Sequence, residues 1–241
     1  MSYLRTEIVR TFRNRRFFIF SIGFPLILFW VIAAPQAKDD VDGIPGLNLA
    51  TYYMVTMAAY GAMIATMSAG ARIAADRETG WVRQLRISPL PIPTYFRTKV
   101  ALAYLTAGTT ITLLYLSGLI IGVRIPIGRW VEMTGLVLVG LIPFAALGIL
   151  LGHLLTTDSM GPVMGGGAGL LALIGGFWFP ITDGFVHDVG QFLPSWWLVQ
   201  ADRVALGGDA WSAKGWIVVL FWAAALTLGA MRAYRRDQAR G

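Results

Sequence analysis

The 241-residue chain has no cysteine, few charged residues and no recognisable catalytic motif. The absence of cysteine excludes disulfide bonds, iron–sulfur clusters, thiol nucleophiles and zinc sites built on thiolates. Only 14% of the residues are charged, whereas a soluble domain of this size carries about 25% to cover its surface. The composition therefore indicates a chain embedded in lipid.

Motifs for nucleotide and metal chemistry are also missing. No G-x-x-x-x-G-K-[ST] phosphate loop occurs, and no lysine follows the glycine cluster at residues 165–169. Such a cluster suits close packing between helices better than phosphate binding. The only two histidines, His153 and His187, fall on opposite sides of the predicted membrane, which argues against a two-histidine metal site. We therefore expect no catalytic residue, metal or cofactor in this chain.

Long apolar segments are what the sequence does contain, and they predict an all-α membrane protein. A helix needs about 20 apolar residues to cross roughly 30 Å of hydrocarbon. Six segments meet this need closely enough to be predicted as spans: residues 17–34, 49–71, 100–123, 133–155, 159–182 and 215–231. The prediction is a single transmembrane domain over residues 1–241.

The distribution of basic residues predicts the orientation of these spans. Fifteen of the 20 basic residues lie in the N-terminus, the second and fourth loops and the C-terminus, which six crossings place on one side. Because basic loops stay in the cytoplasm, both termini are expected to be cytoplasmic. The net charge of +7 is then explained by orientation in a plasma membrane, namely a bacterial inner membrane, and not by nucleic-acid binding.

Two further segments are expected at the membrane surface. Leu4, Ile8 and Phe12 recur at helical spacing among arginines, which predicts an interfacial amphipathic helix over residues 1–16. A basic leader that only fixes topology is a compatible alternative. Residues 183–214 are rich in tryptophan and contain Pro194, which predicts two short helices in a re-entrant or interfacial position on the outer side.

The second cytoplasmic loop, residues 73–95, combines both signs of charge with apolar side chains. Asp76 and Glu78 stand among arginines, and Trp81 and Leu85 follow them. A surface that binds only lipid has no need of acidic residues, so this loop suits a protein partner better.

The same loop resembles a known family. Arg77-Glu78-x-Gly80, followed by Leu85-x-x-Ser88-Pro89-Leu90 and by Lys99, is similar to the pattern of ABC-2 type permeases, the membrane subunits of type V ABC exporters. The drug-resistance and nodulation-factor branch is the most similar. Phe177-Trp178-Phe179-Pro180, Leu193-Pro194 and Arg203 also resemble family segments. The chain departs from the pattern at Asp76, Trp81 and Ser88, where the family usually has Glu, Thr and Thr.

This resemblance implies a set of partners and a coupling site. Two copies of a separate ATPase subunit would bind ATP and magnesium, and a second permease would complete a homodimer or a related heterodimer. The loop would be the coupling helix that docks on the ATPase. Its expected coupling residues are Asp76, Arg77, Glu78, Gly80, Trp81, Leu85, Arg86, Ser88 and Pro89.

By the same resemblance, spans one, two and five would line a transport path that exports substrate by alternating access. Aromatic walls suit amphipathic or hydrophobic substrates such as drugs, lipids or glycolipids. An interfacial aromatic belt is an equally open interpretation of most of these residues, with Tyr60 the strongest path candidate. The candidate path residues are Tyr52, Tyr53, Thr56, Tyr60, Phe177, Trp178 and Phe179.

Two alternatives remain at the level of sequence. An integral membrane enzyme or sensor would use an outer cluster of Asp183, His187, Asp188 and Asp202 as a metal or acid–base site. Separately, His153 lies five residues before Asp158, which is consistent with a proton-responsive pair or with a histidine that only hydrogen-bonds locally.

Overall fold

The computed structural model describes residue 7 and residues 19–35, 48–79 and 92–239. Within these residues the chain forms helices and no β-strand, which confirms the predicted all-α fold. The elements are η1 (Ile19–Gly23), α3 (Phe24–Leu28), η2 (Phe29–Ala33), α4 (Leu49–Met67), α5 (Ala69–Glu78), α7 (Ile92–Ile120), α8 (Ile127–Gly140), α9 (Ile142–Leu154), α10 (Thr157–Gly175), α11 (Gly184–Gly190), α12 (Pro194–Arg203), η3 (Val204–Leu206) and α13 (Ala213–Ala239).

Four helical stretches are long and apolar enough to cross a membrane. They are Leu49–Glu78, Arg97–Ile120, Ile127–Leu154 and Ala213–Asp237, and they correspond to the second, third, fourth and sixth predicted spans. The first predicted span contains a shorter apolar helix, Ser21–Ala33, and the fifth contains α10. A multi-pass membrane protein follows from the four long stretches, while the count of six crossings stays a prediction.

Several helices begin or end away from the predicted limits of the spans, and the fifth and sixth spans are examples. The fifth was expected to reach residue 182, but α10 ends at Gly175 because Gly176 adopts a left-handed conformation with φ of +78°. Such a glycine is a common helix terminator, since it has no Cβ atom to oppose positive φ. The sixth was expected to end at residue 231, but α13 continues as a helix to Ala239.

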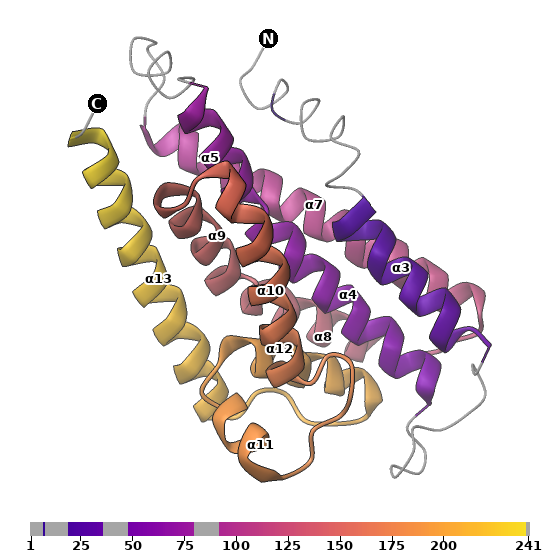
Figure 1. Ribbon diagram of the computed structural model, residues 1–241. Coiled ribbons are helices and arrows are strands. Elements are labelled where there is room, and N and C mark those ends of the chain that lie inside the picture. The colour runs from indigo at the N-terminus through magenta and orange to yellow at the C-terminus, as the bar shows by residue number, and fades with distance from the viewer. Residues whose placement is uncertain (1–6, 8–18, 36–47, 80–91, 240–241) are drawn as a thin grey trace.

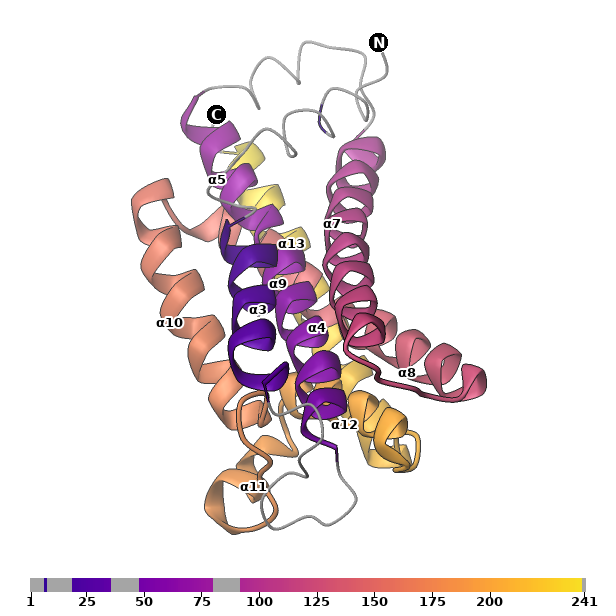
Figure 2. The same cartoon turned by 90° about the vertical axis from the view of Figure 1, so that its right-hand side faces the viewer.

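Helix α4 forms the centre of the bundle. In its most apolar stretch 89% of the residues are buried, and Met54, Met57 and Met63 are fully buried there. A helix that is apolar on all sides is expected in such a position. It packs against α7, α9, α12 and the helical segment at residues 19–33, as Figures 1 and 2 show.

Close backbone contact fixes where α5 crosses α9. A Cβ atom at Gly148 would lie 2.5 Å from the Met67 carbonyl oxygen, and one at Gly152 would lie 2.5 Å from the Gly70 carbonyl oxygen. Because only glycine fits at this distance, Gly148 and Gly152 allow α9 to touch α5 and the last residue of α4, Met67, in the small-xxx-small manner of membrane helices. The crossing places the C-terminal end of α5 beside the C-terminal end of α9.

The segment between α10 and α13 contains two short helices, as its sequence predicts. Pro194 lies at the first turn of α12, where a residue without a backbone N–H group costs nothing. Trp197 and Trp211 both donate hydrogen bonds from Nε1 to backbone carbonyl oxygens, of Gln191 at 2.9 Å and of Trp197 at 2.7 Å. These bonds tie parts of the segment to one another, and Trp222 of α13 donates to the Phe192 carbonyl oxygen at 2.8 Å. The segment lies at the end of the bundle where α13 begins (Figure 1).

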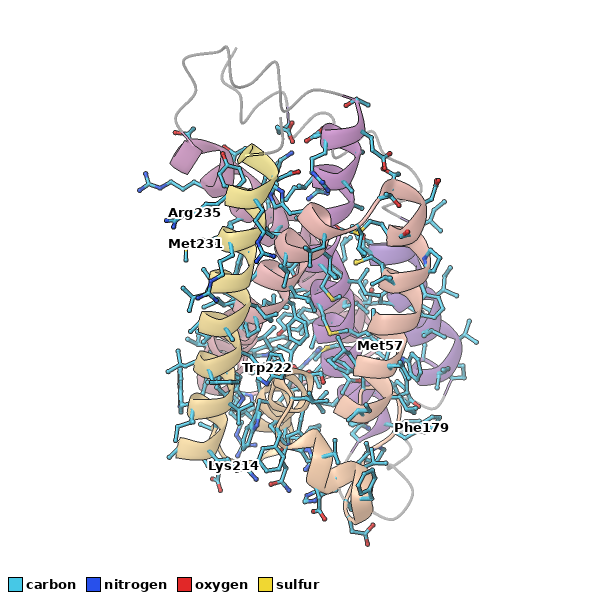
Figure 3. The ribbon with its side chains drawn as sticks, turned by 60° about the vertical axis from the view of Figure 1, so that its left-hand side comes forward. Met57, Phe179, Lys214, Trp222, Met231 and Arg235 are labelled. Atoms are coloured by element: carbon cyan, nitrogen blue, oxygen red, sulfur yellow. The ribbon has the colours of Figure 1, made fainter. Side chains whose placement is uncertain are left out.

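Helix α13 lies at the periphery, against α9. Only 11% of the residues in its most apolar stretch are buried, and Ile217, Leu220 and Phe221 are more than half exposed. An apolar surface of this size suits lipid or another protein better than water. Figure 3 shows Lys214 and Arg235 at opposite ends of this helix, with Met57 farther inside the bundle.

Candidate functional site

The acidic–basic–acidic tripeptide Asp76-Arg77-Glu78 ends α5 and contacts several parts of the chain. Asp76 is buried, and its Oδ2 atom lies 2.8 Å from the ammonium of Lys99 in α7. The same ammonium lies 3.0 Å from the Oε2 atom of Glu7. Lys99 is itself completely buried, so the three side chains form an interior ionic triad. This triad joins the N-terminal region, α5 and α7.

Arg77 connects α5 to α9 and α13. Its Nε atom lies 2.6 Å from Oδ2 of Asp237, and its NH2 group donates to Oδ1 of the same carboxylate at 3.0 Å. Its NH1 group donates to the carbonyl oxygens of Gly152 and Leu155 at 3.1 and 3.4 Å. A two-pronged contact of this kind fixes geometry as well as charge. The guanidinium thus supplies hydrogen bonds to carbonyl groups at the end of α9, where the helix itself leaves such groups without partners.

Glu78 connects α5 to α10. Its Oε1 atom accepts a hydrogen bond of 2.7 Å from the backbone N–H group of Thr157, the first residue of α10. A carboxylate at this position satisfies a free N–H group and complements the positive end of the helix dipole. Each member of the tripeptide therefore binds a different neighbour, and together they fix the point from which residues 80–91 depart.

The other predicted coupling residues lie outside the described residues. These are Gly80, Trp81, Leu85, Arg86, Ser88 and Pro89. Among the described coupling residues, Asp76 is buried, Arg77 is half-buried and Glu78 is exposed. The side chains of Asp76 and Arg77 are thus engaged inside the chain. Sequence reasoning had instead considered the tripeptide as a surface for a partner.

The predicted path residues of α4 meet those that follow α10. The hydroxyl group of Tyr52 donates to the Gly176 carbonyl oxygen at 3.0 Å, and that of Tyr53 donates to the Trp178 carbonyl oxygen at 3.3 Å. The ring of Tyr60 lies 5.8 Å from that of Phe177 and 6.0 Å from that of Trp178, between centroids. These contacts join α4 to the turn at residues 176–178.

Most of these path candidates are enclosed by the chain itself. Phe177 is completely buried, Tyr60 is 6% exposed, and Tyr53 and Trp178 are partly buried. The hydroxyl of the buried Thr56 donates to the Tyr52 carbonyl oxygen of its own helix at 2.9 Å. Only Phe179 presents a large surface, with 67% exposed, and Figure 3 places it at the edge of the bundle. A path along this wall therefore requires the turn to move away from α4.

The outer acidic and histidine residues do not converge. His187 and Asp188 are neighbours, with Nδ1 and Oδ1 3.2 Å apart, and Asp183 precedes α11 at the N-cap position. Asp202 is buried in α12. Within the described part of the chain no group of three or more histidine, aspartate or glutamate residues is arranged to hold a metal ion. The structure thus lends no support to the metal form of the enzyme alternative.

His153 pairs with a residue that its sequence neighbourhood did not indicate. Its Nδ1 atom lies 3.2 Å from Oδ2 of Asp237, and its ring contacts that of Tyr234 edge-on with centroids 5.4 Å apart. Asp158, the partner considered from the sequence, is exposed in the first turn of α10. Sequence reasoning missed Asp237 as a site residue, because it lies 160 positions from Arg77 and no local pattern marks it.

Comparison with known proteins adds two findings. Residues 45–231 match the profile of a family described as "ABC-2 family transporter protein". The chain is also 29% identical over 195 residues to a protein of Bacillus subtilis (strain 168) described as "Putative transport permease YvfS". That alignment covers 79% of this chain and 78% of the relative.

Proposed function

The chain belongs to the ABC-2 family of transporter proteins, and on this premise we propose that it is the permease subunit of an ATP-driven exporter. It would move an amphipathic or hydrophobic substrate outward across a bacterial inner membrane, with both termini in the cytoplasm. A separate ABC ATPase, in two copies, would bind ATP and magnesium. Two permease subunits would associate, and the transport path would lie at the interface between these two subunits. The drug-resistance and nodulation-factor branch is the proposed position within the family.

The observation that carries this proposal is the set of bonds that Asp76, Arg77 and Glu78 make at the end of α5, shortly before residues 80–91 in the sequence. A coupling segment transmits force only if its base is rigidly joined to the helices that must move. Here the base is bonded to α7 through Asp76, to α9 and α13 through Arg77, and to α10 through Glu78. A displacement of residues 80–91 by the ATPase would therefore reach four helices at once.

In this proposal the coupling residues divide into two groups. Asp76, Arg77 and Glu78 would hold the base of the loop. Contact with the ATPase would then come from the residues that follow them, namely Gly80, Trp81, Leu85, Arg86, Ser88 and Pro89. Tryptophan is frequent among the residues that contribute most to binding at protein interfaces, so Trp81 is the proposed anchor.

Substrate passage would begin at the aromatic wall between α4 and residues 176–179. Release of Tyr52 and Tyr53 from the carbonyl oxygens of Gly176 and Trp178 would separate this turn from α4. Tyr60 and Phe177, which now face each other, would then be available to an apolar substrate.

Replacement of Trp81 tests whether the residues after Glu78 contact the ATPase. In membranes that contain this chain and its ABC ATPase, Trp81→Ala should lower co-purification of the ATPase about tenfold or more, since an anchor residue is typically worth at least about 2 kcal/mol. Trp216→Ala is the matched control, because Trp216 is an exposed tryptophan, with 40% of its surface exposed. It lies in the first turn of α13, at the end of the bundle opposite to Asp76-Arg77-Glu78. Unchanged ATPase recovery with Trp81→Ala would contradict the proposed contact.

A further inference from the structure

Asp202, in the last turn of α12, is a buried acid for which the transport function offers no role. Only 1% of its surface is exposed. Both carboxyl oxygens are inaccessible, and neither has a hydrogen-bond partner among the residues that the structure describes. Buried carboxyl groups in proteins are normally bonded to donors or paired with cations. An acid with neither demands a chemical explanation.

The phenol groups and the cation around α12 form no hydrogen bond to Asp202 within the described residues. Tyr52 lies in α4, which packs against α12, and Tyr115 lies in α7, which packs against α4. The hydroxyl of Tyr52 is already donated to Gly176, and that of Tyr115 lies 3.4 Å from Thr134 Oγ1. The adjacent Arg203 places its guanidinium carbon 5.9 Å from the centroid of the Trp196 ring.

The remaining elements that pack against α12 also offer no counter-ion. In α8, the side chains of Arg129 and Glu132 are exposed. Lys214 at the start of α13 is exposed and donates to the side chain of Gln191. Asp158, the titratable residue of α10, is exposed at the far end of that helix, and η3 contains only apolar residues. No salt bridge within the described residues involves Asp202.

An ionised carboxylate in these surroundings would be costly. Removal of an unpaired charge from water costs several kcal/mol, whereas a neutral acid loses only its hydrogen bonds to water. Proteins avoid this cost by keeping such an acid protonated. In agreement, burial raises the pKa of Asp202 well above its ordinary value.

We infer that Asp202 is a proton-binding site: its carboxyl group is neutral while α12 packs as described, and it releases its proton when this packing opens to water. In the release step the carboxyl O–H bond breaks, the electron pair stays on oxygen, and the proton passes to water. The carboxylate that forms is stable only when hydrated, so ionisation and opening favour each other. This inference goes beyond the proposed transport function and does not depend on it.

The direction of the pH effect follows from the number of bound protons. Between the ordinary pKa of an aspartate and the raised pKa of Asp202, the packed arrangement holds one proton more than the opened one. Rising pH therefore weakens the packed arrangement, and acid on this side of the bundle stabilises it. The effect belongs to α12 and its contacts with α4 and α8, which lie at the end of the bundle opposite to Asp76-Arg77-Glu78 (Figure 2).

Thermal unfolding of the purified full-length chain tests the inference without an ATPase. The wild-type Tm should fall as pH rises from about 5 to about 9. Asp202→Asn, which mimics the neutral acid, should reduce this fall and raise the Tm by about 3 °C or more at the upper pH. Asp209→Asn is the matched control, because Asp209 lies in the same segment and is exposed. Parallel pH profiles for the wild type and Asp202→Asn would overturn the inference.

A second measurement on the unaltered chain covers the case in which Asp202→Asn does not fold. A hydrophobic carbodiimide adds to protonated carboxyl groups in apolar surroundings, and mass spectrometry locates the adduct. The peptide that contains Asp202 should be labelled at neutral pH and lose labelling as pH rises, while the exposed Asp209 stays unlabelled. Absence of labelling at Asp202 at neutral pH would overturn the inference. If the chain failed to bind an ATPase but Asp202 was labelled as expected, the proposed transport function would be contradicted and the proton-binding site would still be supported.

Discussion

At the scale of single residues, buried charge marks the end of the bundle that contains Asp76. Lys99 is completely buried, and its ammonium is shared by two acidic side chains, Glu7 and Asp76. Such a group is stable in the interior only while its partners remain in place. The triad therefore makes the position of α5 depend on α7 and on the N-terminal region.

Removal of the ammonium of Lys99 should destabilise the chain. Lys99→Met retains most of the side-chain volume but leaves Glu7 and Asp76 without the cation that both contact. Loss of one member of a buried ionic group typically costs about 3–5 kcal/mol. The free energy of unfolding in detergent, measured by chemical denaturation, should fall by a similar amount. Lys214→Met, which alters an exposed lysine, should change it much less; equal effects of the two substitutions would contradict the structural role of Lys99.

The sequence singles out the tripeptide Asp76-Arg77-Glu78 but does not indicate the residues that it contacts. Asp76, Arg77 and Glu78 are the mixed-charge cluster of the second cytoplasmic loop, and their chemistry alone indicates strong interactions. Lys99 and Glu7 are 92 positions apart, and Arg77 and Asp237 are 160 positions apart. No periodicity or local spacing connects residues at such distances. Whether a charge faces solvent or the interior depends on packing that only the folded chain defines.

At the scale of elements, hydropathy predicted the long helices well and their ends less well. Apolar length is a direct requirement of the membrane, so Leu49–Glu78 and Ala213–Asp237 are visible in the sequence. Helix ends depend on local backbone geometry, and hydropathy does not register the left-handed Gly176 that ends α10. The two short helices before α13 were predictable because proline is favoured in the first turn of a helix and costs about 3 kcal/mol in its interior.

The sequence also does not show which glycines make close contacts between helices. Residues 165–169 form the most conspicuous glycine cluster in the sequence and were predicted to pack closely against another helix. A Cβ atom at Gly165, Gly166, Gly167 or Gly169 would meet no atom within 4 Å. The close crossing instead uses Gly148 and Gly152, whose four-residue spacing is the more specific signal.

Alanine substitutions at Gly148 and at Gly166 should affect stability differently. Gly148→Ala puts a methyl group 2.5 Å from the carbonyl oxygen of Met67, the last residue of α4, so α9 must move away from the junction of α4 and α5. Overpacking of this kind costs about 1–3 kcal/mol, and the Tm of the purified chain should fall. The matched control is Gly166→Ala in α10, where the added methyl group meets no neighbour within 4 Å and should leave the Tm unchanged or slightly higher. A Gly148→Ala chain as stable as the wild type would refute the close crossing.

At the scale of the whole molecule, the two ends of the bundle differ in chemistry. Glu7, Asp76, Lys99 and Asp237 gather at one end, where bonds join the N-terminal region, α5, α7, α9 and α13. Aromatic rings, α11, α12 and the buried Asp202 lie at the other. In the proposed function, the first end would transmit a displacement through ionic contacts, and the second would open and close around apolar surfaces.

The most direct test of the proposed function is the composition of the complex that this chain forms in membranes. The chain would be purified through a tag, after co-expression with an ABC ATPase encoded beside it, and its mass measured by native mass spectrometry. The predicted result is a complex of two permease subunits and two ATPase subunits that hydrolyses ATP. Recovery of this chain without any ATPase, under conditions in which both proteins are folded and present, would contradict its assignment as the permease subunit of an ABC exporter.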